Sequence, residues 1–307
     1  MRKIILDTDM GVDCDDAAAL AIMLNAHKSK IIELLGVTAS SGREGATATI
    51  KAIMDYYQVK DIPIGSFSSN LLECDLINNY AKPIKDRYKI DDINNDSVNM
   101  IRKILSTITD KVTIVAIGPL TNMANLLVSQ ADEYSPLNGV ELVKEKVAKF
   151  LVMGGAFIQN YSKDKINAIF SEWNILQDIK SAVTFSELCP LEIIYSPHEV
   201  GNVVLTKMGK NENPVWLSML EFAKANRFDF EPDFYRQSWD PLTCLFSLDE
   251  SNPDFTLSSK GTVKIDDKGI TTFILDNNGK DYYISTKSNL KNIEKRINEI
   301  IEIGSEL

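Results

Sequence analysis

Short apolar runs and helix-forming segments alternate along most of the chain. The apolar runs have the length of strands, and we predict strands at residues 4–6, 31–37, 62–67, 112–117, 150–153 and 191–195. The segments between them are rich in helix formers or carry apolar residues at helical spacing. They predict helices at residues 17–24, 50–57, 98–108, 178–187 and 218–224. One further helix is predicted to end at residue 128. Strands that alternate with helices form right-handed βαβ units, so this pattern predicts an α/β fold with a largely parallel sheet.

The pattern changes in the C-terminal part of the chain. Residues 262–285 alternate apolar and polar side chains around two turn signals, which is typical of a β-hairpin. Apolar residues at helical spacing then mark a closing helix over residues 290–300. Residues 71–96 have weak periodicity, and we interpret them as a variable insertion. Because no repeat, low-complexity stretch or linker interrupts the sequence, we expect one domain over residues 1–307.

Composition and charge exclude several classes of protein. The 44% hydrophobic and 25% charged fractions are those of an ordinary soluble globular protein. A net charge of −10 argues against nucleic-acid binding, which favours a basic surface. No apolar run approaches the roughly 20 residues that cross a bilayer, so no membrane association is expected. The four cysteines lack the spacing of a zinc site or disulfide framework. The first residues enter a strand without a signal-peptide pattern, so we expect a cytoplasmic location.

Five aspartates within ten residues follow the first predicted strand. They are Asp7, Asp9, Asp13, Asp15 and Asp16. They lie at the carboxyl end of a strand, where open α/β sheets bind their ligands. The amino end of the following helix can favour Asp15 or Asp16 as a cap, but that relieves the repulsion of only one or two carboxylates. A bound Ca²⁺ or Mg²⁺ would offset the rest. The alternative is a solvated acidic loop with one helix cap.

Three other places put polar groups where a parallel sheet presents its ligand edge. Ile117 ends a strand before a Gly-Pro pair that can turn its carbonyl outward, although a plain helix-start turn is equally compatible. Glu172 and Asn174 are two residues apart, so in an extended segment they would face the same way and suit a sugar diol. Asp240 precedes an apolar run, either as a ligand or as a plain helix N-cap.

Taken together, these segments resemble the inosine-uridine-preferring nucleoside hydrolase family. That family opens with a strand followed by Asp-x-Asp-x-Gly-x-Asp-Asp-Ala. Matching segments occur here in order at residues 7–11, 15–17, 117–122, 153–157, 172–174 and 239–240. The resemblance implies a nucleoside hydrolase fold, a Rossmann-like open and mostly parallel sheet flanked by helices. It also implies a calcium-dependent enzyme that hydrolyses the N-glycosidic bond of ribonucleosides to free base and ribose.

The resemblance implies a role for individual residues. It makes Asp9, Asp16, Asp240 and the main-chain carbonyl of Ile117 ligands of Ca²⁺, with Asp9 also the general base that takes a proton from the attacking water. It places Asp15, Asn160, Glu172 and Asn174 on the ribose of the nucleoside substrate, with Asp7 in a supporting position. Family members are often dimers or tetramers, so the resemblance also implies a homo-oligomer.

The sequence departs from the family pattern in three places. Asp13 and Cys14 are inserted into the opening signature, and Asp13 has no evident role. A family asparagine after the second strand is absent, with Gly42 near that place and Arg43 beside it. Trp239 stands where many members carry a histidine that acts as acid to the leaving base.

A tryptophan before the last metal aspartate resembles the purine-specific branch of the family, in which an indole stacks on the base. Purine nucleosides are therefore favoured on the strength of Trp239 alone, although a core tryptophan at the sheet edge is an equal alternative. Tyr80 and Tyr88 are candidates for a second stacking ring. His198 follows a different strand, and we predict that it does not replace the missing acid.

Two other functions compete with hydrolysis. A ribose- or nucleoside-binding protein with little turnover would explain the missing asparagine and histidine. A haloacid-dehalogenase-type phosphatase would explain the Asp7-Thr8-Asp9 start, but that family requires Thr or Val where this chain has Gly11. Phosphate release from a generic ester would favour the second of these.

Overall fold

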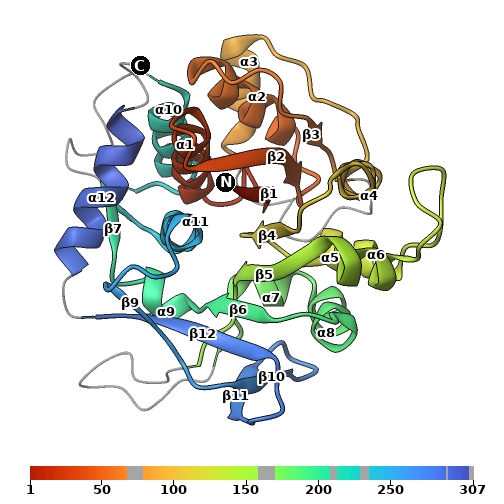
Figure 1. Cartoon of the computed structure of the whole chain (residues 1–307). Helices are drawn as coiled ribbons and strands as arrows, with labels where there is room; N and C mark the ends of the chain where they lie inside the picture. The colour runs from red at the N-terminus through yellow and green to blue at the C-terminus, as the bar shows by residue number, and fades with distance from the viewer. Residues whose placement is uncertain (68–78, 158–169, 208–212, 229–234, 288–289, 304–307) are drawn as a thin grey trace.

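The computed structural model describes residues 1–67, 79–157, 170–207, 213–228, 235–287 and 290–303. Its central sheet has the strand order β11-β10-β12-β6-β5-β4-β1-β2-β3, with β9 paired to β12. The strands from β3 to β12 along this order are parallel to their neighbours, whereas β9, β10 and β11 pair antiparallel. A small antiparallel pair, β7 with β8, lies outside this sheet. Helices cover both faces (Figure 1).

The strands are β1 Arg2–Thr8, β2 Ile32–Ala39, β3 Ile64–Gly65, β4 Val112–Ala116, β5 Val147–Met153, β6 Ile193–Ser196, β7 Leu205–Lys207, β8 Tyr235–Gln237, β9 Phe255–Leu257, β10 Gly261–Ile265, β11 Thr271–Leu275 and β12 Asp281–Thr286. The helices are α1 Asp15–Lys28, α2 Ala46–Tyr56, α3 Ala81–Tyr88, α4 Ser97–Thr107, α5 Thr121–Val128, α6 Gly139–Lys146, α7 Trp173–Gln177, α8 Ile179–Leu188, α9 His198–Gly201, α10 Pro214–Ala225, α11 Trp239–Leu248 and α12 Leu290–Ile303. No helix within these described residues is long and apolar enough to cross a bilayer.

Neighbouring residues of the central strands face two separate cores. In β1, Ile4 and Leu6 belong to the core beneath α1, α2, α10, α11 and α12, whereas Ile5 belongs to the core beneath α4, α5, α6 and α8. The same alternation holds in β5, where Leu151 and Phe150 face opposite cores. Successive strand side chains point to opposite faces, so an uninterrupted apolar run is the sequence expected for a strand buried on both sides.

The strand order reverses beside β1. The chain moves from β1 to β2 and β3 on one side, then returns to β4, β5 and β6 on the other. In open α/β sheets the carboxyl ends of the two strands at such a switch point form the ligand crevice. The acidic loop after β1 and Ile117 after β4 both lie at this point.

The predicted α/β fold is confirmed, with differences in detail. The hairpin expected in residues 262–285 is formed by β10 and β11, whereas β12 extends the central sheet parallel to β6. Within residues 71–96, interpreted as a variable insertion, α3 forms a helix that the weak periodicity did not indicate, and residues 68–78 lie outside the described chain. Helices α6 and α9 were not predicted, since both are short and α6 is largely polar.

A buried arginine fastens the loop between α5 and α6. Arg102 of α4 is 1% exposed and donates through Nε and Nη2 to both carboxylate oxygens of Asp132. Its remaining donors reach Ser129 Oγ at 2.8 Å and the main-chain carbonyls of Ser135 and Leu137 at 3.3 and 3.0 Å. Hydrogen bonding to Arg102 lowers the pKa of Asp132 to about 2. Each charge in this pair therefore has partners within the protein.

Candidate active site

The acidic loop turns sharply between β1 and α1. Gly11 adopts a φ of +103°, which L side chains rarely adopt, and Val12 N donates to Asp9 O at 3.0 Å. Cys14 occupies the N-cap position of α1. The expectation that Asp15 or Asp16 caps this helix is therefore wrong, since both lie in its first turn, where a negative charge still meets the positive end of the helix dipole.

Three buried carboxylates from distant parts of the chain converge at this loop. Asp9, Asp16 and Asp240 each place an oxygen so that the three atoms lie within 4.8 Å of one another. Asp240 comes from the first turn of α11, whose N-cap is Ser238, so the alternative that Asp240 merely caps a helix is wrong. Its main-chain N–H donates to Asp15 Oδ2 at 3.1 Å, which ties the two helix starts together.

Burial and mutual repulsion disfavour the charged form of these groups. The pKa of Asp9 is raised well above its usual range by burial and by the charges of Asp15 and Asp13, and the Arg43 guanidinium opposes this only partly. Burial and the neighbouring aspartates raise the pKa values of Asp16 and Asp240 in the same way. Such a cluster is stabilised by a positive charge at its centre.

The donor set fits a hard divalent cation. The ligand oxygens are carboxylates, and Oδ2 of Asp16 is buried without a hydrogen-bond donor in the described part of the chain. Buried carboxylate oxygens without donors are costly unless a cation or water reaches them. Asp9, Asp16 and Asp240 can therefore hold a metal ion.

Asp7 lies beneath the site and supports it. Its Oδ1 accepts hydrogen bonds from Thr38 Oγ1 and, at 2.8 Å, from Asn122 Nδ2, which also donates to Ala39 O. Burial raises the pKa of Asp7 to about 7. These contacts join the ends of β1 and β2 to the start of α5, so Asp7 positions the strand ends.

Glu172 and Asn174 reach the same cavity from a short helix. The prediction of an extended segment is wrong, because Glu172 caps α7 and accepts from the main-chain N–H groups of Asn174 and Ile175 at 2.9 and 3.2 Å. Asn174 Nδ2 donates to the carbonyl of Ile117 at 3.3 Å. The two side chains therefore face the cavity because the helix start turns them inward, and burial raises the pKa of Glu172 to about 7.

The end of β4 approaches Asp9 closely. A Cβ on Gly118 would lie 2.4 Å from Ser40 Oγ and 2.8 Å from Asp9 Cβ, so only glycine fits there. The close approach holds Gly118 against the Asp9 backbone, and the preceding Ile117 lines the cavity. The alternative of a plain helix-start turn therefore explains only part of this segment.

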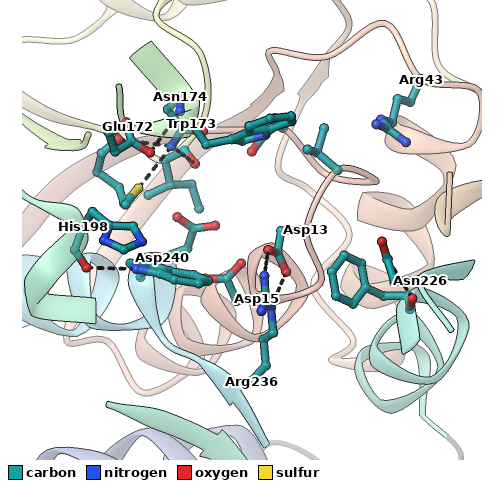
Figure 2. A pocket seen from close by; sticks show the side chains of 16 residues that line it. Asp13, Asp15, Arg43, Glu172, Trp173, Asn174, His198, Asn226, Arg236 and Asp240 are labelled. Atoms are coloured by element: carbon teal, nitrogen blue, oxygen red, sulfur yellow. Dashed lines mark hydrogen bonds and ion pairs between the residues drawn. The ribbon is translucent and has the colours of Figure 1, made fainter. Parts of the chain in front are cut away.

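These groups line one cavity of about 330 Å³ (Figure 2). Its polar lining includes Asp9, Asp15, Asp240, Glu172 and Asn174, whereas Asp16 lies at 0% exposure beneath it. Burial and the charge of Asp13 raise the pKa of Asp15 to about 7, although Arg236 lowers it.

A second set of side chains forms the rest of the wall. It consists of Val12, Asp13, Arg43, Met153, Trp173, His198, Phe222, Asn226, Arg236 and Trp239. Trp239 lines the cavity, donates from Nε1 to the carbonyl of His198 at 2.9 Å and also packs against the core around α1, so both interpretations describe part of its position. His198 lies closer to the site than its position after β6 suggested, because α9 carries its ring to 5.3 Å from the Trp239 ring.

The structure changes several predictions for the part of the cavity expected to hold the base of the nucleoside. Asp13 does have a partner, since both of its carboxylate oxygens accept hydrogen bonds from Arg236. Tyr80 is buried and donates to Met10 Sδ, and Tyr88 packs against the core, so neither lies among the lining residues. Asn160, expected on the ribose, lies outside the described residues. Arg236 and Phe222 were missed, because nothing in their local sequence sets them apart from ordinary strand and helix residues.

Residues 4–298 match the family model described as inosine-uridine preferring nucleoside hydrolase. The chain belongs to this family. A nucleoside hydrolase is an enzyme that acts on small-molecule nucleosides, and this membership decides against the phosphatase alternative.

Relatives of this nucleoside hydrolase carry names that state different base specificities. "Probable uridine nucleosidase 1" of Oryza sativa subsp. japonica is 24% identical over 296 residues, 88% of this chain and 83% of that protein. "Pyrimidine-specific ribonucleoside hydrolase RihA" of Photobacterium profundum is 26% identical over 70% of this chain and 68% of its own. The solved "Purine-Preferring Ribonucleoside Hydrolase from Gardnerella vaginalis" shares the fold, with a TM-score of 0.72, 18% identity and complete coverage of both chains.

Proposed function

We propose that this nucleoside hydrolase uses Ca²⁺ to hydrolyse the N-glycosidic bond of ribonucleosides to free base and ribose. The observation that carries the proposal is the convergence of Asp9, Asp16 and Asp240 on one side of a cavity that Glu172 and Asn174 also line. Carboxylate oxygens at this spacing suit a hard cation, and the acid and amide beside them suit a sugar diol.

The metal-holding residues would be Asp9, Asp16, Asp240 and the main-chain carbonyl of Ile117. Bound Ca²⁺ would supply a positive charge there that favours the ionised carboxylates and lowers the pKa of the attacking water. Asp9 acts as the general base and takes a proton from that water. Its place on the loop at the end of β1 brings it into the cavity while its main chain is held against Val12 and Gly118.

The remaining polar residues hold the sugar and stabilise its positive charge. Asp15, Glu172 and Asn174 line the cavity, and we propose that they bind the ribose hydroxyls, with Asn160 joining them. Cleavage of a glycosidic bond passes through an oxocarbenium-like sugar, which carboxylates and amides around the ring stabilise. Glu172 is oriented for this by three main-chain N–H groups, including that of Gly155 at 3.1 Å.

We further propose that purine nucleosides are preferred. The support is Trp239, whose ring lines the cavity beside His198, and Trp173, which lines it from α7. Large aromatic surfaces favour a large base. The relatives include both pyrimidine-specific and purine-preferring proteins, so the preference must be measured on this chain.

The test is release of free base by the purified protein. Inosine, guanosine, adenosine and uridine are each incubated with Ca²⁺-loaded protein and with protein stripped by a chelator, and bases are separated by chromatography. We expect release that depends on Ca²⁺ and is fastest with a purine. Survival of all four nucleosides in the presence of Ca²⁺ would disprove hydrolysis in this form.

A nucleoside-binding protein with little turnover is the second candidate. The observation that favours it is Arg43, which lines the cavity beside the place where the family asparagine was expected. Tight nucleoside binding in calorimetry without base release would support this candidate over the first. A cytoplasmic location, a single domain over residues 1–307 and a homo-oligomer, either dimer or tetramer, stay predictions alongside both.

A further inference from the structure

The inserted Asp13 and the β8 residue Arg236 form an ion pair on the cavity wall. Arg236 Nε donates to Asp13 Oδ1 at 2.8 Å, and Nη2 donates to Oδ2. Asp13 Oδ1 is also fixed by the main-chain N–H of Cys14 at 2.7 Å. The side chains are only 19% and 26% exposed, and both line the cavity that holds the carboxylate cluster. Figure 2 shows the two side chains pointing at each other near Asp15.

Aromatic rings fix the plane of the guanidinium. Arg236 Cζ lies 4.9 Å from the centre of the Trp239 ring and 5.1 Å from that of Phe222. Both rings also line the cavity. A guanidinium held by a carboxylate edge and by two rings has little freedom to rotate, and so presents its remaining N–H groups in a fixed direction.

The donors of Arg236 are not exhausted by these contacts. A guanidinium has five N–H groups. Asp13 takes two of them, and Gln237 Oε1 accepts one from Nη1 at 3.1 Å. Within the described part of the chain no acceptor takes the other two, one on Nη1 and one on Nη2. A cation with unused donors on a cavity wall can bind a carbonyl oxygen or a negative charge of a ligand.

Hydrolysis creates such a negative charge on the leaving base. When the bond from C1′ to the base nitrogen breaks, its electron pair stays on the base, and in a base with a ring carbonyl it spreads to that oxygen. The water oxygen bonds to C1′, its proton goes to Asp9, and the departed base takes a proton from solvent. A base without a ring carbonyl, such as adenine, offers no such oxygen to a donor.

We propose that Arg236, positioned by Asp13, binds the carbonyl oxygen of the leaving base and so makes this enzyme selective for oxo bases such as hypoxanthine over adenine. This inference rests on the proposed function and adds the group that stabilises the base as it leaves. In a chain with Trp239 in place of the histidine that many family members carry, Arg236 supplies charge stabilisation to the leaving base.

The experiment compares Arg236→Gln and Asp13→Asn with the unchanged protein on three ribosides that share the same sugar. Inosine and adenosine differ in the carbonyl, and p-nitrophenyl β-ribofuranoside releases an anion that leaves without help. For Arg236→Gln we expect kcat on inosine to fall roughly 10²–10³-fold, while rates on the other two change less than about threefold. Asp13→Asn should show a smaller loss in the same direction, because it loosens the guanidinium without removing it.

Arg87→Gln, on the exposed face of α3, is the matched control and should leave all three rates unchanged. Arg236→Lys keeps the charge without the fork and should recover only part of the inosine rate. An equal loss on all three ribosides, or an unchanged ratio of inosine to adenosine, would overturn the role of Arg236 while leaving hydrolysis established. Absence of hydrolysis by the unchanged protein would overturn both proposals.

Discussion

Two of the places where the protein buries charge differ in how that charge is compensated. Around Arg102, the charged groups are matched within the chain, and Asp132, Ser129 and two carbonyls accept hydrogen bonds from its three guanidinium nitrogens. Around Asp9, Asp16 and Asp240, several carboxylates share one buried space and raise one another's pKa values. The first arrangement stabilises the fold by itself, whereas the second is complete only with a ligand.

The difference is between charge that is buried with partners from the protein and charge that is buried without them. A charged group that lacks a partner is unfavourable for stability, so its presence in a cavity indicates a binding role. Hydrogen bonding to Arg102 lowers the pKa of Asp132 to about 2, and burial raises the pKa of Asp15 to about 7. The pKa is thus lowered where a cation of the chain meets the carboxylate, and raised at Asp15, where burial and a like charge dominate.

The largest expected effect comes from removing charge at the acidic site. Asp9→Asn should lower kcat roughly 10²–10⁴-fold, because the general base is lost. Stability without metal should stay the same or rise, since one repelling charge is removed. Steady-state rates and urea unfolding measure the two effects. Asp267→Asn, in the exposed turn between β10 and β11, is the control, and an unchanged rate in Asp9→Asn would contradict the role given to Asp9.

The network around Arg102 should show the reverse, with a loss of stability and no loss of rate. Arg102→Met should lower the free energy of unfolding by about 3 kcal/mol, because it leaves buried carbonyls and a carboxylate without their donor. The rate per folded molecule should not change, as Arg102 is remote from the cavity lining. Urea denaturation followed by circular dichroism gives the first quantity. A midpoint equal to that of Arg87→Met would show that the network adds nothing to stability.

The smallest effect concerns pH and metal together. Asp7, Asp15 and Glu172 have pKa values of about 7, above those of the unfolded chain, so the metal-free fold binds more protons and loses stability as pH rises from about 5 to about 8. Ca²⁺ at 100 times its Kd should restore about 2.7 kcal/mol. Thermal unfolding should show a larger increase in Tm on adding Ca²⁺ at the higher pH, and equal increases at both would contradict it.

Sequence reasoning located most of the elements and the acids that form the buried cluster, because these depend on local patterns. Apolar runs buried on both faces are visible in sequence, and the five clustered aspartates are conspicuous without a structure. Even the convergence of Asp240 on Asp9 followed from a family resemblance. The local conformation of Glu172 and Asn174 was harder to predict, since a five-residue helix has too little periodicity to be identified from sequence.

The base side could not be predicted, for a physical reason. Arg236, Phe222 and His198 reach the cavity through tertiary packing of β8, α10 and α9, and none carries a motif. The partner of Asp13 is 223 positions away, a separation that no local pattern encodes. The side chains on this part of the cavity wall are thus scattered along the chain, whereas two of the three clustered carboxylates, Asp9 and Asp16, lie within eight positions of each other.

The covering of α1 by α12 has a consequence for how the protein forms during synthesis. Ile293 and Ile297 of α12 complete the core around α1, and the hydroxyl of Tyr57 donates to the carbonyl of Ile301 at 3.0 Å. Asp240 and α11 also arrive late. The helix that carries Asp15 and Asp16 is thus made first and enclosed last. An emerging chain carries this apolar segment open to solvent until residue 301 is free, so it depends on fast late folding or on a chaperone to avoid aggregation.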